Sequence, residues 1–119
     1  MFKQPQIYET TTVCTTVEPG ICGFSCTIRA RKSDPRMVSV EISETECEQI
    51  CKLTPLVVQI SMQELFAPLT RNKVYAAAQE CGCHTSCIVP AAILKTVEIA
   101  MEMALPRQAR IEFGTCSRT

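Results

Sequence analysis

The chain has few aromatic side chains, no net charge and no long hydrophobic run. Aromatic residues make up 5% of the 119 residues and tryptophan is absent, so the stacking platforms of single-strand nucleic-acid binders are missing. Twelve basic residues balance twelve acidic ones, which argues against a nucleic-acid or anionic-membrane footprint. No stretch offers the ~20 uninterrupted apolar residues of a membrane-spanning helix. We therefore expect no nucleic-acid partner and no membrane partner.

Signals of export, nucleotide binding and catalysis are also missing. The polar start "MFKQPQIYETTT" lacks the apolar core of a signal peptide, so we expect a cytoplasmic protein. Four glycines build no phosphate-binding loop, and no dinucleotide fingerprint is present. With a single histidine, a Cys–His nucleophile pair has no recognisable spacing. The sequence thus favours a binding protein over an enzyme.

Cysteine is what the chain has in excess. There are nine, an odd number that cannot be fully paired within one chain. In a reducing compartment, clustered cysteines are more often metal ligands or redox groups than disulfides. The cysteines occupy positions 14, 22, 26, 47, 51, 81, 83, 87 and 116.

The first third of the chain has the composition and alternation of β-strands. Cys22, Phe24 and Cys26 alternate with polar residues, so we expect all three to point inward from one strand. Short turns rich in proline, glycine and aspartate separate the segments, which predicts an antiparallel meander. The expected strands are residues 10–17, 21–32 and 37–44.

Most of the remaining chain has helical patterns. Thr45 with Glu48, and Ser61 with Glu64, match the capping box that opens a helix. Pro90 suits the first turn of a long helix that we expect to reach Ala104. The first expected helix begins at Thr45 and ends before Pro55, and a second begins at Ser61. Two further helices are expected over residues 71–80 and 90–104.

These elements predict one α+β domain spanning residues 1–119. A small meander is marginally stable alone, so we expect a three- to four-stranded antiparallel sheet with helices packed on one face. Residues 109–115 would add a last strand at an edge of the sheet. Such an exposed edge would permit a homo-oligomer.

Three places along the chain combine cysteine with features of a ligand site. Cys22 follows a turn and precedes a glycine, whereas Cys47 and Cys87 each lie at an expected helix amino terminus, where the local positive charge favours a thiolate. The segment "CGCHTSC" adds Cys81, Cys83 and His84. Thiolates with one imidazole suit zinc or an iron–sulfur cluster.

The order of these motifs resembles the U-type iron–sulfur scaffold family. The resemblance covers roughly residues 18–102 and rests on "GICGFSCTIRA", on "ETEC" opening a helix, and on "HTSC" followed by "AAILKTVE". "TSC" before a helix also resembles the end of a TSCPD-type cysteine-rich domain. Over its full length the chain looks most like a family of small cysteine-rich proteins that share "CGF" and "C-x-V-P-A-A-I-L-K".

The resemblance implies the scaffold fold, with Cys22, Cys47, Cys87 and His84 holding the cluster and iron–sulfur assembly proteins as partners. Phe24 stands where the scaffolds have aspartate, and two residues separate His84 from Cys87. The chaperone-binding segment of the scaffolds has no counterpart. We therefore transfer the site and the fold, but neither cluster donation nor the chaperone.

Other roles for the cysteines stay open at this point. Cys87 lies at an expected helix amino terminus, and its thiolate could act with Cys83 or Cys22 as the resolving thiol. That role would instead indicate a thiol redox or sulfur-carrier protein with redox partners. A third possibility is that the cysteines serve only as small apolar side chains in the hydrophobic core, and we expect this of Cys26 and Cys51. Cys14 and Cys116 receive no role.

Overall fold

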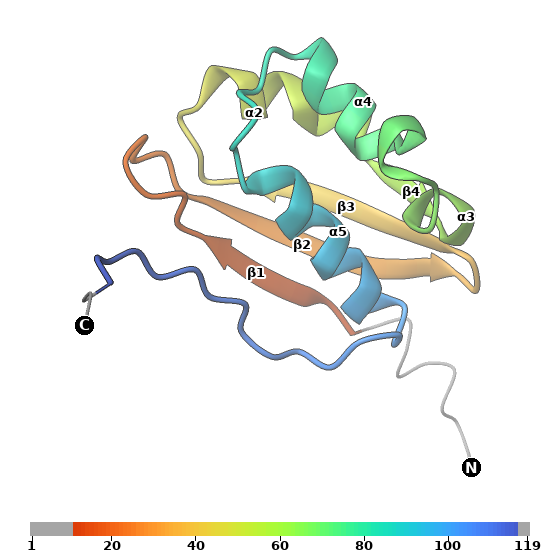
Figure 1. Ribbon diagram of the computed structural model, residues 1–119. Helices are drawn as coiled ribbons and strands as arrows, with labels where there is room; N and C mark the ends of the chain where they lie inside the picture. The colour runs from red at the N-terminus through yellow and green to blue at the C-terminus, as the bar shows by residue number, and fades with distance from the viewer. Residues whose placement is uncertain (1–10, 117–119) are drawn as a thin grey trace.

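The computed structural model describes residues 11–116. Four antiparallel strands form one sheet in chain order, which confirms the expected meander and the α+β class (Figure 1). The fourth strand, β4, is a three-residue segment that the sequence patterns did not reveal. The strands are β1 (Val13–Val17), β2 (Cys26–Asp34), β3 (Met37–Ser43) and β4 (Gln59–Ser61).

The helices pack over one face of this sheet (Figure 1). The longest of them, α5, lies across β1 and β2, while α2 and α4 cover the side toward β3. The bounds are α2 (Glu48–Leu53), α3 (Met62–Leu65), α4 (Lys73–Glu80) and α5 (Val89–Ala100), with short 3₁₀ turns at Thr54–Leu56 and Leu69–Arg71. No helix within residues 11–116 is long and apolar enough to cross a membrane.

The core lies between the sheet and α5. Alternate residues of β2 and β3 point into it, as the period-2 pattern predicts, and Ile28 and Val38 are fully buried. From α5, Ile93 and Val97 meet them at helical spacing. Burial of each such side chain stabilises the fold by about 1.5–3 kcal/mol. The sheet and the helices therefore hold each other in place.

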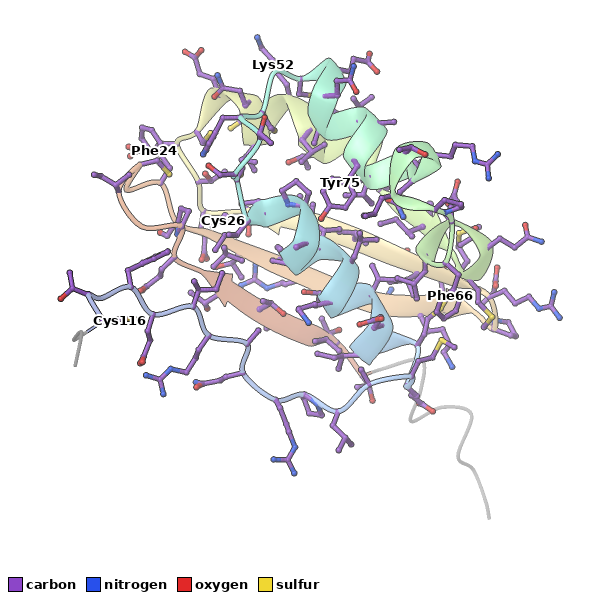
Figure 2. All side chains as sticks on the ribbon, in the orientation of Figure 1. Phe24, Cys26, Lys52, Phe66, Tyr75 and Cys116 are labelled. Atoms are coloured by element: carbon purple, nitrogen blue, oxygen red, sulfur yellow. The ribbon has the colours of Figure 1, made fainter. Side chains whose placement is uncertain are left out.

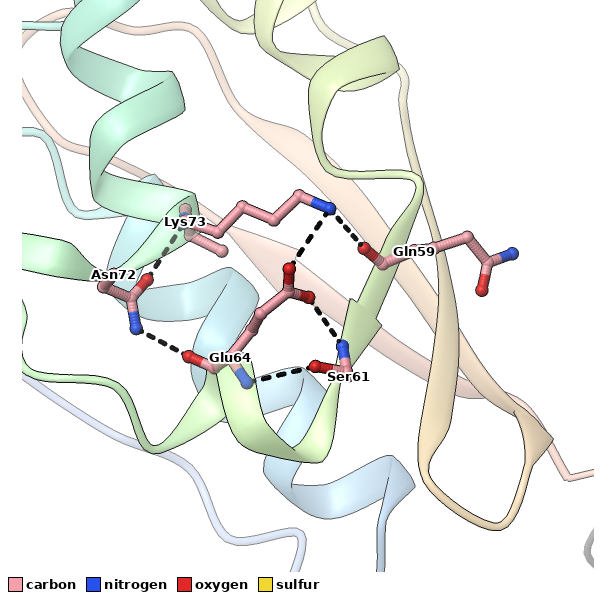
Figure 3. Close-up of polar contacts among 6 residues, drawn as sticks. Gln59, Ser61, Glu64, Asn72 and Lys73 are labelled. Atoms are coloured by element: carbon pink, nitrogen blue, oxygen red, sulfur yellow. Dashed lines mark hydrogen bonds and ion pairs between the residues drawn. The ribbon is translucent and has the colours of Figure 1, made fainter.

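A polar network fixes the connection between β4 and α4 (Figure 3). The Ser61 hydroxyl accepts from the Glu64 backbone N–H and the Glu64 carboxylate accepts from the Ser61 N–H, so this predicted capping box is confirmed. Buried Asn72 caps α4 by accepting from the Val74 N–H at 2.9 Å. Lys73 Nζ donates to the Gln59 carbonyl and lies 3.6 Å from the Glu64 carboxylate.

Three expected elements after residue 44 differ from the structure. The Thr45–Glu48 capping box is wrong, because α2 begins at Glu48 and Cys47 is its N-cap. The long helix ends at Ala100 rather than Ala104, and Glu102 has the left-handed φ of 64° that reverses the chain. Residues 109–115 form no strand and are exposed, since alternation alone makes no strand without a neighbour to pair with.

Candidate metal centre at the cysteine end of the sheet

Three loops meet at one end of the sheet, and each carries candidate ligands (Figure 1). They precede β2, α2 and α5, and they enclose a small cavity of ≈ 180 Å³. We name this the cysteine cavity. The residues lining it are Pro19, Cys22, Phe24, Cys47, Gln49, Ile50, Gly82, Cys83, His84, Cys87 and Val89.

The first loop places Cys22 on a tight turn. Gly20 and Gly23 have φ values of 96° and 76°, which only glycine adopts without strain, and the Gly23 N–H donates to the Gly20 carbonyl at 2.9 Å. Strand β2 therefore begins at Cys26 rather than at residue 21. The expectation that Cys22 and Phe24 point into the core is wrong, because both are exposed on the loop.

The second loop ends at Cys47, the N-cap residue of α2. Its backbone N–H donates to Thr45 Oγ1 at 3.2 Å, so the threonine fixes the loop instead of capping the helix. The Cys47 thiol donates to Gln49 Oε1 at 3.3 Å, and no side chain caps the first turn of α2. The half-buried Cys47 sulfur is thereby held beside the cavity.

The third loop carries the "CGCHTSC" segment. Helix α4 ends in a Schellman motif, in which Gly82 adopts a φ of 78° and the Cys83 N–H donates to the Ala78 carbonyl. A second turn, closed by the Cys87 N–H donating to the His84 carbonyl at 3.0 Å, leads into α5. These two turns place Cys83, His84 and Cys87 along one wall of the cavity.

The structure thus brings together five of the six candidate ligands. Cys22, Cys47 and Cys87 come from three separate loops, and Cys83 and His84 join them. Cys81, the C-cap of α4, does not line the cavity and packs partly buried against the core. Sequence patterns did not single out Gln49, which lies two residues after Cys47 and accepts a hydrogen bond from its thiol.

Burial raises the pKa of three thiols at or behind the cavity. It raises the pKa of Cys26 to about 11, with smaller contributions from the charges of Cys87 and Cys47. For Cys87 burial also dominates, a hydrogen bond from the Val89 N–H lowers the pKa, and Cys47 and Cys22 raise it. The pKa of Cys83 is raised by burial and then by the charges of Cys87, Cys81 and Cys47. The thiols therefore lie close enough to influence one another's ionisation.

The remaining cysteines lie outside the cavity. Cys26 is 1% exposed and belongs to the core, as predicted. Cys51 is exposed, so its expected place in the core is wrong; it lies on the outer side of α2, and Ile50 takes the buried position. Cys14 and Cys116 are exposed as well, and all nine cysteines are free thiols.

The donor set fits a soft metal in kind, but its members are not gathered as a metal site. Four thiols and one imidazole facing a common cavity are the ligands that zinc and iron–sulfur clusters use. Within residues 11–116, no three His, Cys, Asp or Glu side chains are already close enough together to hold a metal ion. Coordination would therefore require the loops to draw the donors inward.

Comparison with known proteins places the chain in a family. No curated protein and no solved structure matches it. A family model described as "Family of unknown function (DUF6951)" matches residues 13–113, which include the sheet, the helices and every residue lining the cysteine cavity. The chain therefore belongs to the DUF6951 family.

Proposed function

We propose that this protein binds a soft metal, as an iron–sulfur cluster or a zinc ion, in the cysteine cavity. The observation that carries the proposal is the convergence of five cysteine and histidine side chains from three separate loops on one cavity of ≈ 180 Å³. Cys22, Cys47 and Cys87 are the three principal ligands of the metal. Cys83 or His84 supplies the fourth.

The surroundings of the cavity suit thiolate ligands. The Val89 N–H donates a hydrogen bond to the Cys87 sulfur. The Gln49 amide, whose Oε1 accepts from the Cys47 thiol, would by a flip of its side-chain amide present its NH₂ group to a Cys47 thiolate. Hydrogen bonds of this kind orient metal ligands and adjust their basicity. The apolar side chains of Phe24, Ile50 and Val89 complete the wall and limit access of water. A bound metal would supply the charge that keeps the thiols deprotonated, despite their raised pKa values.

The spacing of the donors bears on which group is bound. They line one cavity but are not gathered around a single point, and a cluster spans more space than one ion. We therefore favour a cluster over a single zinc ion. We infer a role in iron–sulfur cluster assembly or carriage, in the cytoplasm, where reducing conditions keep the nine thiols free.

The alternative function, thiol redox or sulfur transfer, has less support. Such chemistry needs a thiolate at neutral pH, and a nearby second thiol to resolve it. The raised pKa values of Cys83 and Cys87 oppose thiolate formation in the metal-free protein. A titration that found a Cys87 pKa below that of ordinary cysteine would reverse this preference.

The decisive experiment is metal and acid-labile sulfide analysis, with a visible spectrum, on protein purified without oxygen. Iron with sulfide and broad visible absorbance would support a cluster, whereas stoichiometric zinc alone would support a zinc site. Serine replacement of Cys22, Cys47 or Cys87 should abolish loading. Serine at Cys14, Cys51 or Cys116, which are exposed cysteines outside the cavity, should leave loading unchanged. Absence of any metal from the wild-type protein would overturn the proposal.

A further inference from the structure

The charge of the molecule is unevenly distributed although its sum is zero. The three loops and their flanks, residues 17–26, 43–50 and 80–89, contain no lysine or arginine. They contain five exposed glutamates, which flank the cavity-lining residues in sequence: Glu18, Glu44, Glu46, Glu48 and Glu80. The opposite end of the sheet, with the β2–β3 hairpin and the start of α4, is where basic residues gather: Arg31, Lys32, Arg36, Arg71 and Lys73.

Most of these glutamates form no ion pair within the part of the chain that the structure describes. Glu44 accepts from the Thr27 hydroxyl at 2.7 Å and lies 3.8 Å from the Arg29 guanidinium. The other four form no ion pair with any residue that the structure describes. His84 is the only side chain in the three loops that can carry a positive charge. Acidic side chains therefore outnumber basic ones around the mouth of the cysteine cavity; the nearest basic residues in sequence are Arg29, which pairs with Glu44, and Lys52 in α2.

Two apolar side chains lie on the same rim. Ile21, next to Cys22, is fully exposed, and Phe24 is 43% exposed. Figure 2 shows Phe24 on the loop that precedes β2. Neither residue carries a donor atom for a metal, and apolar side chains held in water at the mouth of a site are typical of protein contacts. Both residues lie at the turn formed by Gly20 and Gly23, which presents their side chains to solvent beside the cavity.

We infer that the rim of the cysteine cavity docks a protein partner with a lysine- or arginine-rich face. The apolar pair Ile21 and Phe24 would supply the contact, and the unpaired glutamates would select a basic partner and repel acidic ones. The inference rests on the proposed function for its purpose, since a metal carrier has to meet the protein that loads or unloads it. Its test does not require metal.

The test is an NMR titration of the reduced, metal-free protein with two synthetic peptides. One has lysines flanking a leucine–phenylalanine pair, and the other has glutamate in place of every lysine. We expect the lysine peptide to bind at least about tenfold more tightly at low salt, with less preference at high salt. Amide shifts should be confined to residues 18–25, 44–48 and 80–87.

Matched variants separate this surface from a general charge effect. E46Q/E48Q/E80Q should remove the preference for the lysine peptide, whereas E41Q/E98Q/E102Q, outside the three loops, should retain it. I21S/F24S should weaken binding at every salt concentration, and L69S, which alters an exposed apolar residue near the opposite end, should not. Equal binding of both peptides, shifts at the other end of the sheet, or binding unaffected by I21S/F24S would each overturn the inference.

The two proposals fail in different ways. A protein that binds the lysine peptide at the cavity rim but takes up no metal would retain the docking surface and overturn the proposed function. A protein that loads metal and ignores the peptide would do the reverse.

Discussion

Replacement of Cys26 by alanine should distinguish a core cysteine from the metal-binding ones nearby. Cys26 is 1% exposed, and its thiol forms no hydrogen bond with the residues that the structure describes. The sulfur is about as large as one buried methylene group, whose burial contributes ~0.8 kcal/mol, and its removal also leaves a small cavity. The free energy of unfolding should therefore fall by about 1–2 kcal/mol in total. In a domain of this size, the Tm should fall by about 4–10 °C.

The assay pairs thermal unfolding with metal analysis. Cys26→Ala should unfold earlier and load as much metal as the wild type. Cys87→Ala, at a half-buried cavity position, should lose the metal with a smaller change in the metal-free Tm. Cys26→Ser should cost more than Cys26→Ala, about 1–3 kcal/mol, because it buries a hydroxyl without a partner. A Cys26→Ala protein with unchanged Tm and no metal would refute this reasoning.

The same residue has a consequence at alkaline pH. Burial raises the pKa of the Cys26 thiol from 9.0 to about 11, with smaller contributions from the charges of Cys87 and Cys47. The folded protein therefore holds the Cys26 thiol proton more tightly than the unfolded chain does. The stabilisation is complete below about pH 9 and is lost as the pH rises toward 11. Cys26→Ala should therefore flatten the pH dependence of the unfolding free energy in this range. Denaturant titrations at several pH values measure it.

Three other outcomes are expected. Asn72→Ala should lower the unfolding free energy, measured by urea denaturation, by about 1–2 kcal/mol, because it removes the cap of α4 and a hydrogen bond to the Glu64 carbonyl. Asn72→Asp keeps the cap and should lower the unfolding free energy by less. Timed alkylation read by mass spectrometry should modify the exposed cysteines first and Cys26 last. Zinc uptake at neutral pH should release protons to the buffer, because burial keeps the Cys87 thiol protonated in the metal-free protein, and Cys87→Ala, which should not load metal, should release none.

Local patterns predicted most of the sheet and the helices. The alternation of Ile28, Ala30 and Val40 with polar residues matches the pleat of β2 and β3, and one face of each strand is buried. The Ser61–Glu64 box succeeded because both of its hydrogen bonds lie within four residues. Such features depend on neighbours in sequence, so they can be recognised before the fold is known.

Patterns failed where a distant partner was decisive. Residues 109–115 alternate as a strand does, but the sheet ends at β1 without them. β4 is too short to recognise and exists because β3 pairs with it. Thr45 matched a capping box, but its hydroxyl accepts from Cys47, before the helix begins. For the two strands the backbone partner is set by the packing of other elements, whereas Thr45 forms a local turn that competes with the capping box.

The sequence by itself determined that this is an α+β protein with an excess of cysteine near turns and helix starts, because periodicity and turn chemistry are local properties. It also identified Cys22, Cys47, His84 and Cys87 as candidate ligands. Only the tertiary structure decided that the loops bearing them enclose one cavity, that Cys83 joins them while Cys81 does not, and that Cys51 lies at the surface. Convergence and burial depend on how the chain folds back on itself, and this is set by the packing of helices onto the sheet.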